Sequence, residues 1–204
     1  MFNVSDRFVG LTKGEARLSV STQLTILDKL RGGDRRSVGR SNQVVATIRR
    51  QPALFPALID GMHHDDEVVR MRAADALKKL TVMNPEWLQP FKAQLIKLAA
   101  RATQQELRWH LAQVLPRLEL SRRDRVIVVA VFRRYLQDQS RIVKAFAMQG
   151  FTDLAIQEHR LRAPVRRLIS SLTRTGSPSM KTRGRKLLFQ LDTSAVPCHA
   201  PVAR

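Results

Sequence analysis

Four twelve-residue segments of this chain share one apolar pattern, and this repetition constrains the fold more than any other feature. The segments start at Val69, Leu107, Val143 and Met180, with separations of 38, 36 and 37 residues. In each segment, apolar or small residues stand at the first, fifth, eighth, ninth and twelfth positions. That spacing places them on one side of an α-helix. The segments therefore predict four equivalent amphipathic helices.

Helix-start signals precede these segments, and a second helix fits between successive copies. Three positions before the starts stand Asp66, Gln104, Ser140 and Ser177, and Asp and Ser are good N-caps. The intervening helices are expected to begin at Pro52, Pro85, Ser121 and Pro164. Because pairs of helices that recur at a fixed period stack on one another, the pattern is typical of an α-solenoid.

The array has less regular sequence at both ends. A leading helix is expected within residues 34–50, with Val38, Val45 and Ile48 on its apolar side, and a capping helix over residues 22–30. Residues 193–204 have two prolines and no apolar periodicity, which indicates a flexible tail. We therefore expect an N-terminal extension at 1–21, one structural domain at 22–192 and a C-terminal tail at 193–204.

The stretch Asp65–Leu77, DDEVVRMRAADAL, and its three echoes resemble the first helix of a HEAT repeat. The resemblance covers about residues 22–192 and implies an all-α fold, a right-handed α-solenoid of about four to five HEAT-like helical hairpins. It also implies a ladder of contacts between repeats, whose basic positions are Arg70, Arg108, Lys144 and Lys181. The ladder also needs an acidic residue in each repeat, and only two repeats have one there, Asp65 and Asp138.

The charge of the chain is strongly positive and uneven. The formal net charge is +19, and residues 101–204 hold 20 Lys and Arg against 7 Asp and Glu. Such a field attracts polyanions, although a run of cations is often only a solvated face. The HEAT resemblance implies that the second helices line the concave side of the solenoid. The partner-binding residues expected there are Lys92, Lys97, Arg101, Arg122, Arg125, Arg133, Arg134, Arg166 and Arg167.

Few residues suggest catalysis, a metal or a cofactor. The single cysteine, Cys198, lies beside His199 in the expected tail, where no shaped site would hold a reactive thiolate. The His63–Asp66 stretch, HHDD, is better interpreted as a polar turn whose Asp66 caps the next helix. We expect no catalytic residue, metal, cofactor or small-molecule ligand. Because no secretory signal or membrane span is found, we expect a cytoplasmic protein, as a monomer.

Two functions from different classes remain. The first is a non-catalytic binding or scaffold module whose basic face takes an acidic protein segment or a nucleic acid backbone. The alternative is an alkylpurine DNA glycosylase type of enzyme, a HEAT-like class that uses a carboxylate beside aromatic side chains. Its nearest candidates here are Glu86 with Trp87 and Asp124 with Tyr135. Trp109 is expected to pack between repeats, with an aromatic platform for a base as the alternative.

Overall fold

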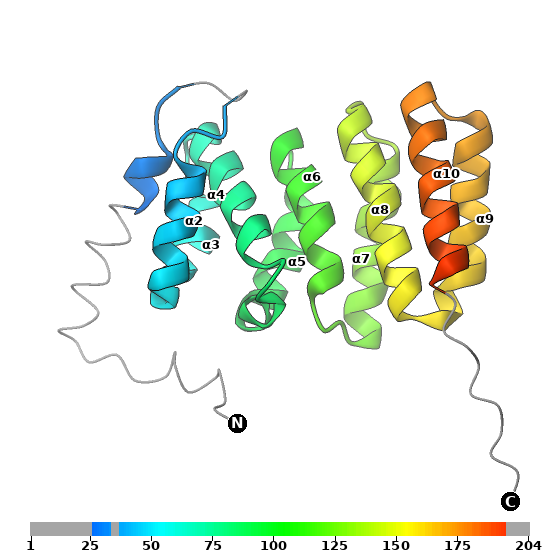
Figure 1. Cartoon of the computed structure of the whole chain (residues 1–204), viewed down its shortest axis with the longest axis horizontal. Helices are drawn as coiled ribbons and strands as arrows, with labels where there is room; N and C mark the ends of the chain where they lie inside the picture. The colour runs from blue at the N-terminus through cyan, green and yellow to red at the C-terminus, as the bar shows by residue number, and fades with distance from the viewer. Residues whose placement is uncertain (1–25, 34–36, 195–204) are drawn as a thin grey trace, which may run out of the picture. The chain divides into compact units, whose positions relative to one another are not determined.

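The computed structural model describes residues 26–33 and 37–194, and within these residues the regular structure is entirely helical. Residues 26–30 are helical, so only the second half of the expected capping helix lies within the described residues. Figure 1 shows the succession of antiparallel helices along the chain. The α-helices are α2 (Ser41–Arg50), α3 (Pro56–Gly61), α4 (Glu67–Leu80), α5 (Lys92–Arg101), α6 (Gln105–Val114), α7 (Arg122–Leu136), α8 (Arg141–Gln157), α9 (His159–Thr175) and α10 (Pro178–Thr193). The 3-10 helices are η2 (Pro52–Leu54), η3 (Pro85–Phe91) and η4 (Leu115–Arg117).

Contacts divide the chain into two compact units, which meet between Glu119 and Leu120. In unit 1, α4 packs against α2, α3 and α6, and α5 packs against α6. In unit 2, α8 packs against α7, α9 and α10, and α9 also packs against α10. Each unit therefore has a central helix, α4 or α8, that buries its apolar side against its neighbours.

The repeated apolar columns form the cores of both units. The predicted first helices are α4, α6, α8 and α10, and their first-column residues are at most 7% exposed. The fifth, eighth and twelfth columns are also buried throughout, and in the ninth column only Leu188 is partly exposed. Periodic apolar spacing thus identified the buried side of each of these helices correctly.

Side-chain caps fix the starts of several helices at the predicted residues. Asp66 Oδ1 accepts a hydrogen bond from Val68 N at 2.8 Å. The hydroxyls of Ser140 and Ser177 accept from the amides at the first column of their repeats. Ser121 and Asp124 form a complete capping box at the start of α7. These bonds satisfy amides that have no partner inside the helix.

Several predicted helix boundaries are wrong, and proline explains most of the differences. The helix expected from Pro52 is divided into η2 and α3, because Pro56 begins a new helix. The helix expected from Pro85 is a 3-10 segment up to Phe91, with Pro90 inside it, and becomes α-helical only at Lys92. Proline has no amide hydrogen to donate, so a regular i→i−4 ladder is interrupted at these sites.

Two further expectations are corrected by the structure. Helix α9 begins at His159, five residues before the expected start, and Pro164 lies inside it. In the leading helix, Val38 is 46% exposed and precedes α2, and its place on the apolar side is taken by Val44. Val45 and Ile48 are buried as predicted.

Candidate functional site

Helix α5 presents two of its three cations to solvent. Lys97 and Arg101 are exposed and four residues apart, so they lie on the same side of the helix. Within the described residues, neither side chain makes a hydrogen bond or an ion pair. Lys92 is partly buried, and its Nζ donates to Glu119 O at 3.1 Å. Lys97 and Arg101 are therefore the α5 cations best placed to meet a partner.

Helix α7 has one buried side and one exposed side with four arginines. Its buried residues are Val128, Val131, Phe132, Tyr135 and Leu136. The exposed residues are Arg122, Arg123, Val126, Ile127, Ala130, Arg133 and Arg134. At 100° per residue, these seven form one continuous side of the helix. No acidic residue stands on this side, which we call the α7 face.

Arg125 does not belong to the α7 face, although it was predicted to bind a partner. Its side chain is about one-third exposed and lies on the other side of the helix. Its Nη1 donates to Glu158 Oε2 at 2.7 Å, and its Nη2 donates to Leu120 O at 3.1 Å. These bonds connect the start of α7 to the turn before α9, so Arg125 acts within the fold.

Helix α9 has a straight row of three exposed arginines. Arg160, Arg167 and Arg174 are spaced by seven residues, so they lie within a narrow strip along the helix. The residues between them on this side are small, namely Ala163 and Ser171. None of the three guanidinium groups has a hydrogen bond or ion pair to any described residue. We call this strip the α9 face.

Two other α9 arginines are held by the end of α10. Arg166 Nε donates to Asp192 Oδ1 at 2.9 Å, and Arg162 donates to Ser194 O. The carboxylate raises the pKa of Arg166, and the guanidinium lowers the pKa of Asp192. Of the two arginines predicted on α9, Arg167 is available to a partner and Arg166 is already paired. Arg160 and Arg174 belong to the α9 face but were left out of the predicted set.

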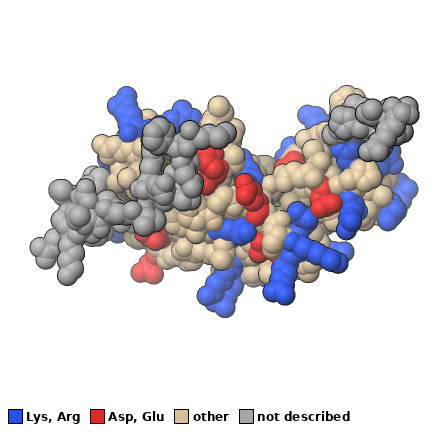
Figure 2. Space-filling view, turned by 90° about the horizontal axis from the view of Figure 1, so that it is seen from below, with Lys and Arg blue, Asp and Glu red and all other residues tan. Residues whose placement is uncertain are grey.

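The acidic residues of unit 2 are too few to neutralise its cations. Residues 120–204 contain 17 Lys and Arg but only 5 Asp and Glu. All five acids already accept hydrogen bonds: Asp124 and Asp138 near helix starts, Asp153 from Gln149, Glu158 from Arg125 and Asp192 from Arg166. Figure 2 shows Lys and Arg side chains projecting at many points of one face, with several acidic side chains among them. The α7 and α9 faces carry no acidic residue of their own, so both keep an excess of positive charge.

The comparisons with known proteins agree with this architecture. A family model described as a HEAT repeat domain matches residues 33–191, which is more than half of the chain. The chain belongs to the HEAT repeat family. Its fold is accordingly an all-α solenoid of HEAT hairpins, as the resemblance of Asp65–Leu77 and its echoes implied. Comparison with curated proteins and with solved structures gave no significant match.

The HEAT ladder has a clear rung between α4 and α6. Arg70 Nε donates to Gln104 Oε1 at 2.8 Å, and Gln104 Nε2 donates back to Glu67 O at 2.9 Å. An amide thus takes the place of the acid in this rung. Arg108 donates to Thr103 O in its own turn at 2.6 Å. The amines of Lys144 and Lys181 make no hydrogen bond or ion pair to the described residues.

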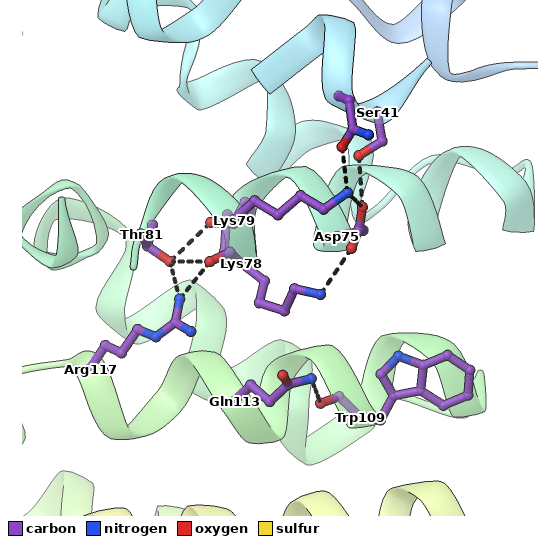
Figure 3. Close-up of polar contacts among 10 residues, drawn as sticks. Ser41, Asp75, Lys78, Lys79, Thr81, Trp109, Gln113 and Arg117 are labelled. Atoms are coloured by element: carbon purple, nitrogen blue, oxygen red, sulfur yellow. Dashed lines mark hydrogen bonds and ion pairs between the residues drawn. The ribbon is translucent and has the colours of Figure 1, made fainter. Parts of the chain in front are cut away.

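Sequence reasoning missed a buried polar cluster between the HEAT repeats of unit 1, which Figure 3 shows in part. Asp75 is 5% exposed and accepts hydrogen bonds from Ser41 Oγ at 2.8 Å and Lys78 Nζ at 2.9 Å. Lys79 also pairs with Asp75, and Arg117 donates to Thr81 Oγ1 at 2.8 Å. The pattern of polar residues at i, i+3 and i+4 on α4 was the available signal.

A second missed residue, Arg72, holds the loop before α2. It is 2% exposed, and its guanidinium donates to the carbonyl oxygens of Leu30, Arg31, Gly32 and Ser37. A side chain at Gly39 would meet this guanidinium, since a Cβ there would lie 2.5 Å from Arg72 Cζ. Arg72 therefore has a structural role in the first hairpin.

The remaining candidate clusters serve the fold. In the HHDD turn, His64 Nδ1 accepts from Asp66 N at 2.9 Å while Asp66 caps α4, which confirms the predicted cap. Among the described residues, no group of three or more His, Cys, Asp and Glu could hold a metal ion. No helix in the same residues is long and apolar enough to cross a membrane. Cys198 and His199 lie outside the described residues.

Three of the four residues in the carboxylate–aromatic pairs of the alternative function have contacts within the fold, namely Trp87, Asp124 and Tyr135. Trp87 packs edge-on against Phe55 with ring centroids 5.4 Å apart, while Glu86 is exposed. Asp124 belongs to the capping box, and Tyr135 is fully buried. Trp109 is partly buried and contacts the ring of His110 edge-on.

Proposed function

We propose that this chain is a non-catalytic HEAT-repeat binding module that holds a polyanionic partner against its exposed arginines. The partner is an acidic protein segment or a nucleic acid backbone, and the setting is the cytoplasm. In this role the protein carries out no reaction and binds no cofactor or small-molecule ligand. The α9 face is the observation that carries it.

The α9 face has the features of an anion-binding strip. Along a helix, residues spaced by seven lie about 10.5 Å apart, so the three guanidinium groups cover about 21 Å. Each group can grip two oxygens of a carboxylate or phosphate at once. Exposed arginines that repel one another weaken a fold slightly, and within the described residues no acid offsets them. A partner with matching negative charge would relieve that repulsion.

The direct test is binding of the full chain to polyanions over a series of salt concentrations. Labelled duplex DNA, single-stranded RNA and polyglutamate are suitable probes. For DNA, the logarithm of the affinity should fall linearly with the logarithm of the salt concentration, with a slope of about −0.9 for each phosphate neutralised. The triple variant Arg160→Gln, Arg167→Gln, Arg174→Gln should flatten the slope for every probe that binds.

A matched control is a triple variant of engaged arginines, Arg125→Gln, Arg162→Gln, Arg166→Gln. It removes the same formal charge, but it removes groups that already have partners inside unit 2. We expect a smaller change in slope for this control, after circular dichroism has confirmed that both variants fold. The proposal is wrong if none of the three probes binds at about 0.15 M salt, or if both variants alter the slope equally.

A further inference from the structure

The α7 face differs in chemistry from the α9 face, although both are exposed and basic. It combines four arginines with two large apolar side chains, Val126 and Ile127, which are 66% and 46% exposed. The α9 face has small residues between its arginines. Single exposed apolar residues are common on protein surfaces, but these two are adjacent, on one helix side, and framed by cations.

The order of residues around α7 places the apolar groups in the middle of the face. At 100° per residue, Ala130 lies at the centre, with Val126 and Ile127 on either side one turn earlier. Arg122 and Arg123 stand at the start of the face, and Arg133 and Arg134 at its end. The Arg134 guanidinium also lies over the Tyr135 ring, 5.6 Å from its centroid.

This arrangement matches an amphipathic acidic helix better than a nucleic acid backbone. A phosphate backbone is polar along its whole length, so it would leave Val126 and Ile127 in water. Apolar side chains of a partner helix would cover them, and burial of such groups favours binding. Ala130 is small enough to let a partner helix approach to the 8–10 Å between axes that helix packing requires. The arginines at both ends would then meet acidic residues of the partner.

We propose that the α7 face docks an amphipathic helix of a partner protein, with apolar residues in its middle turns and Asp or Glu at both ends. The face extends about 18 Å from Arg122 to Arg134, so about 12 residues of the partner helix take part. This inference rests on the proposed polyanion binding and names the partner class for the α7 face.

Two peptides of identical composition test this inference. The first has two Glu at each end and Leu residues spaced by three and four in the middle, and the second has the same residues scrambled so that no apolar stripe remains. The intact chain should bind the striped peptide at least about tenfold more tightly than the scrambled one. Duplex DNA serves as a third probe, with charge but no apolar side.

Two variants of the α7 face separate apolar contact from charge. The double variant Val126→Ser, Ile127→Ser keeps every charge and changes only exposed residues, so it should fold. This variant should lose most of the preference for the striped peptide and should bind DNA as the intact chain does. Ala130→Arg adds a cation at the centre, so it should weaken the striped peptide but strengthen DNA binding. Each variant is compared with the intact chain by fluorescence anisotropy.

The outcomes separate this inference from the proposed function. The inference is overturned if the two peptides bind equally well, or if the serine variant keeps the preference for the striped peptide. Binding of DNA and both peptides with equal, salt-sensitive affinity would overturn the inference while the proposed function stands. Failure of all probes to bind would overturn both.

Discussion

At the scale of single residues, α4 and α6, which pack together, each carry a buried titratable group whose pKa is lowered, Asp75 on α4 and His110 on α6. Burial raises the pKa of Asp75, but hydrogen bonds from Lys79, Lys78 and Ser41 outweigh this and lower it to about 2. Burial lowers the pKa of His110 to about 3, and the nearby Lys78 ammonium adds to that effect. The folded protein therefore holds His110 neutral and Asp75 charged at pH 7.

These shifts predict that acid destabilises unit 1 in two stages. Between the unfolded pKa of 6.5 and about 3, the unfolded state binds a proton at His110 that the folded state does not. The free energy of unfolding should therefore fall by about 1.4 kcal/mol per pH unit across that window from this group alone. Asp75 has a depressed pKa, so its contribution is present above 3.8 and is lost as the pH falls towards about 2.

The variant His110→Gln measures the first stage. Urea unfolding of the intact chain and the variant should be compared from pH 7.5 to pH 4.5. The stability difference between the two should change in favour of the variant as the pH falls below about 6.5. Parallel pH profiles for the two proteins would show that His110 does not titrate on unfolding.

Arg72 predicts a large loss of stability at a single position. Replacement by Met keeps the apolar stem but removes hydrogen bonds to Leu30, Gly32 and Ser37, whose carbonyl oxygens would lose a charged donor. Arg72→Met should lower the free energy of unfolding by about 3 kcal/mol, measured by urea unfolding. Arg49→Met, at an exposed position on α2, is the control and should change it by less than about 0.5 kcal/mol. Equal effects of the two variants would contradict the assigned role of Arg72.

At the scale of elements, the close contact between α9 and α10 depends on a small residue in a repeat column. A Cβ at Gly184 would lie 1.9 Å from Thr173 Oγ1 and 3.0 Å from Thr173 Cβ. The Thr173 hydroxyl is held by its hydrogen bond to Ile169 O at 2.7 Å, so it is not free to turn away without cost. Overpacking of this kind forces helices apart.

Gly184→Ala should therefore destabilise unit 2, although alanine is the better helix former. We expect a loss of about 1–3 kcal/mol in the free energy of unfolding, measured by urea. The double variant Gly184→Ala, Thr173→Ala removes the hydroxyl from the contact and should recover part of that loss. If Gly184→Ala instead stabilises the protein, the helices are not as closely packed as described.

The helices were largely predictable because each apolar position of the repeat recurs in four helices, and the same side of each helix is therefore expected to be buried. One helix with an apolar stripe is ambiguous, but the same stripe at Val69, Leu107, Val143 and Met180 is not. Boundaries near proline were less predictable, since Pro52 begins a 3-10 segment while Pro164 is accommodated inside α9. Proline restricts the local backbone, but tertiary packing decides whether a helix continues through it.

At the scale of the whole molecule, the sequence shows the excess of positive charge. It does not show which of the arginines are paired with an acidic residue in the fold. Arg125 and Arg166 are paired by acids that lie 33 and 26 residues away, so only the fold shows that they are engaged. Local sequence gives the side of a helix on which an arginine stands, whereas its partner comes from another helix.

The most direct test of the account compares two neighbouring arginines. Arg167→Gln and Arg166→Gln each remove one charge at adjacent positions of α9, but only Arg166 has an ion pair, to Asp192. Binding to the best polyanion probe should be measured for both over a salt series. We predict that Arg167→Gln reduces the steepness of the salt dependence by about one unit, as loss of one phosphate contact does, and that Arg166→Gln changes it much less. Equal slopes for the two variants and the intact chain would contradict the claim that the α9 face binds the partner.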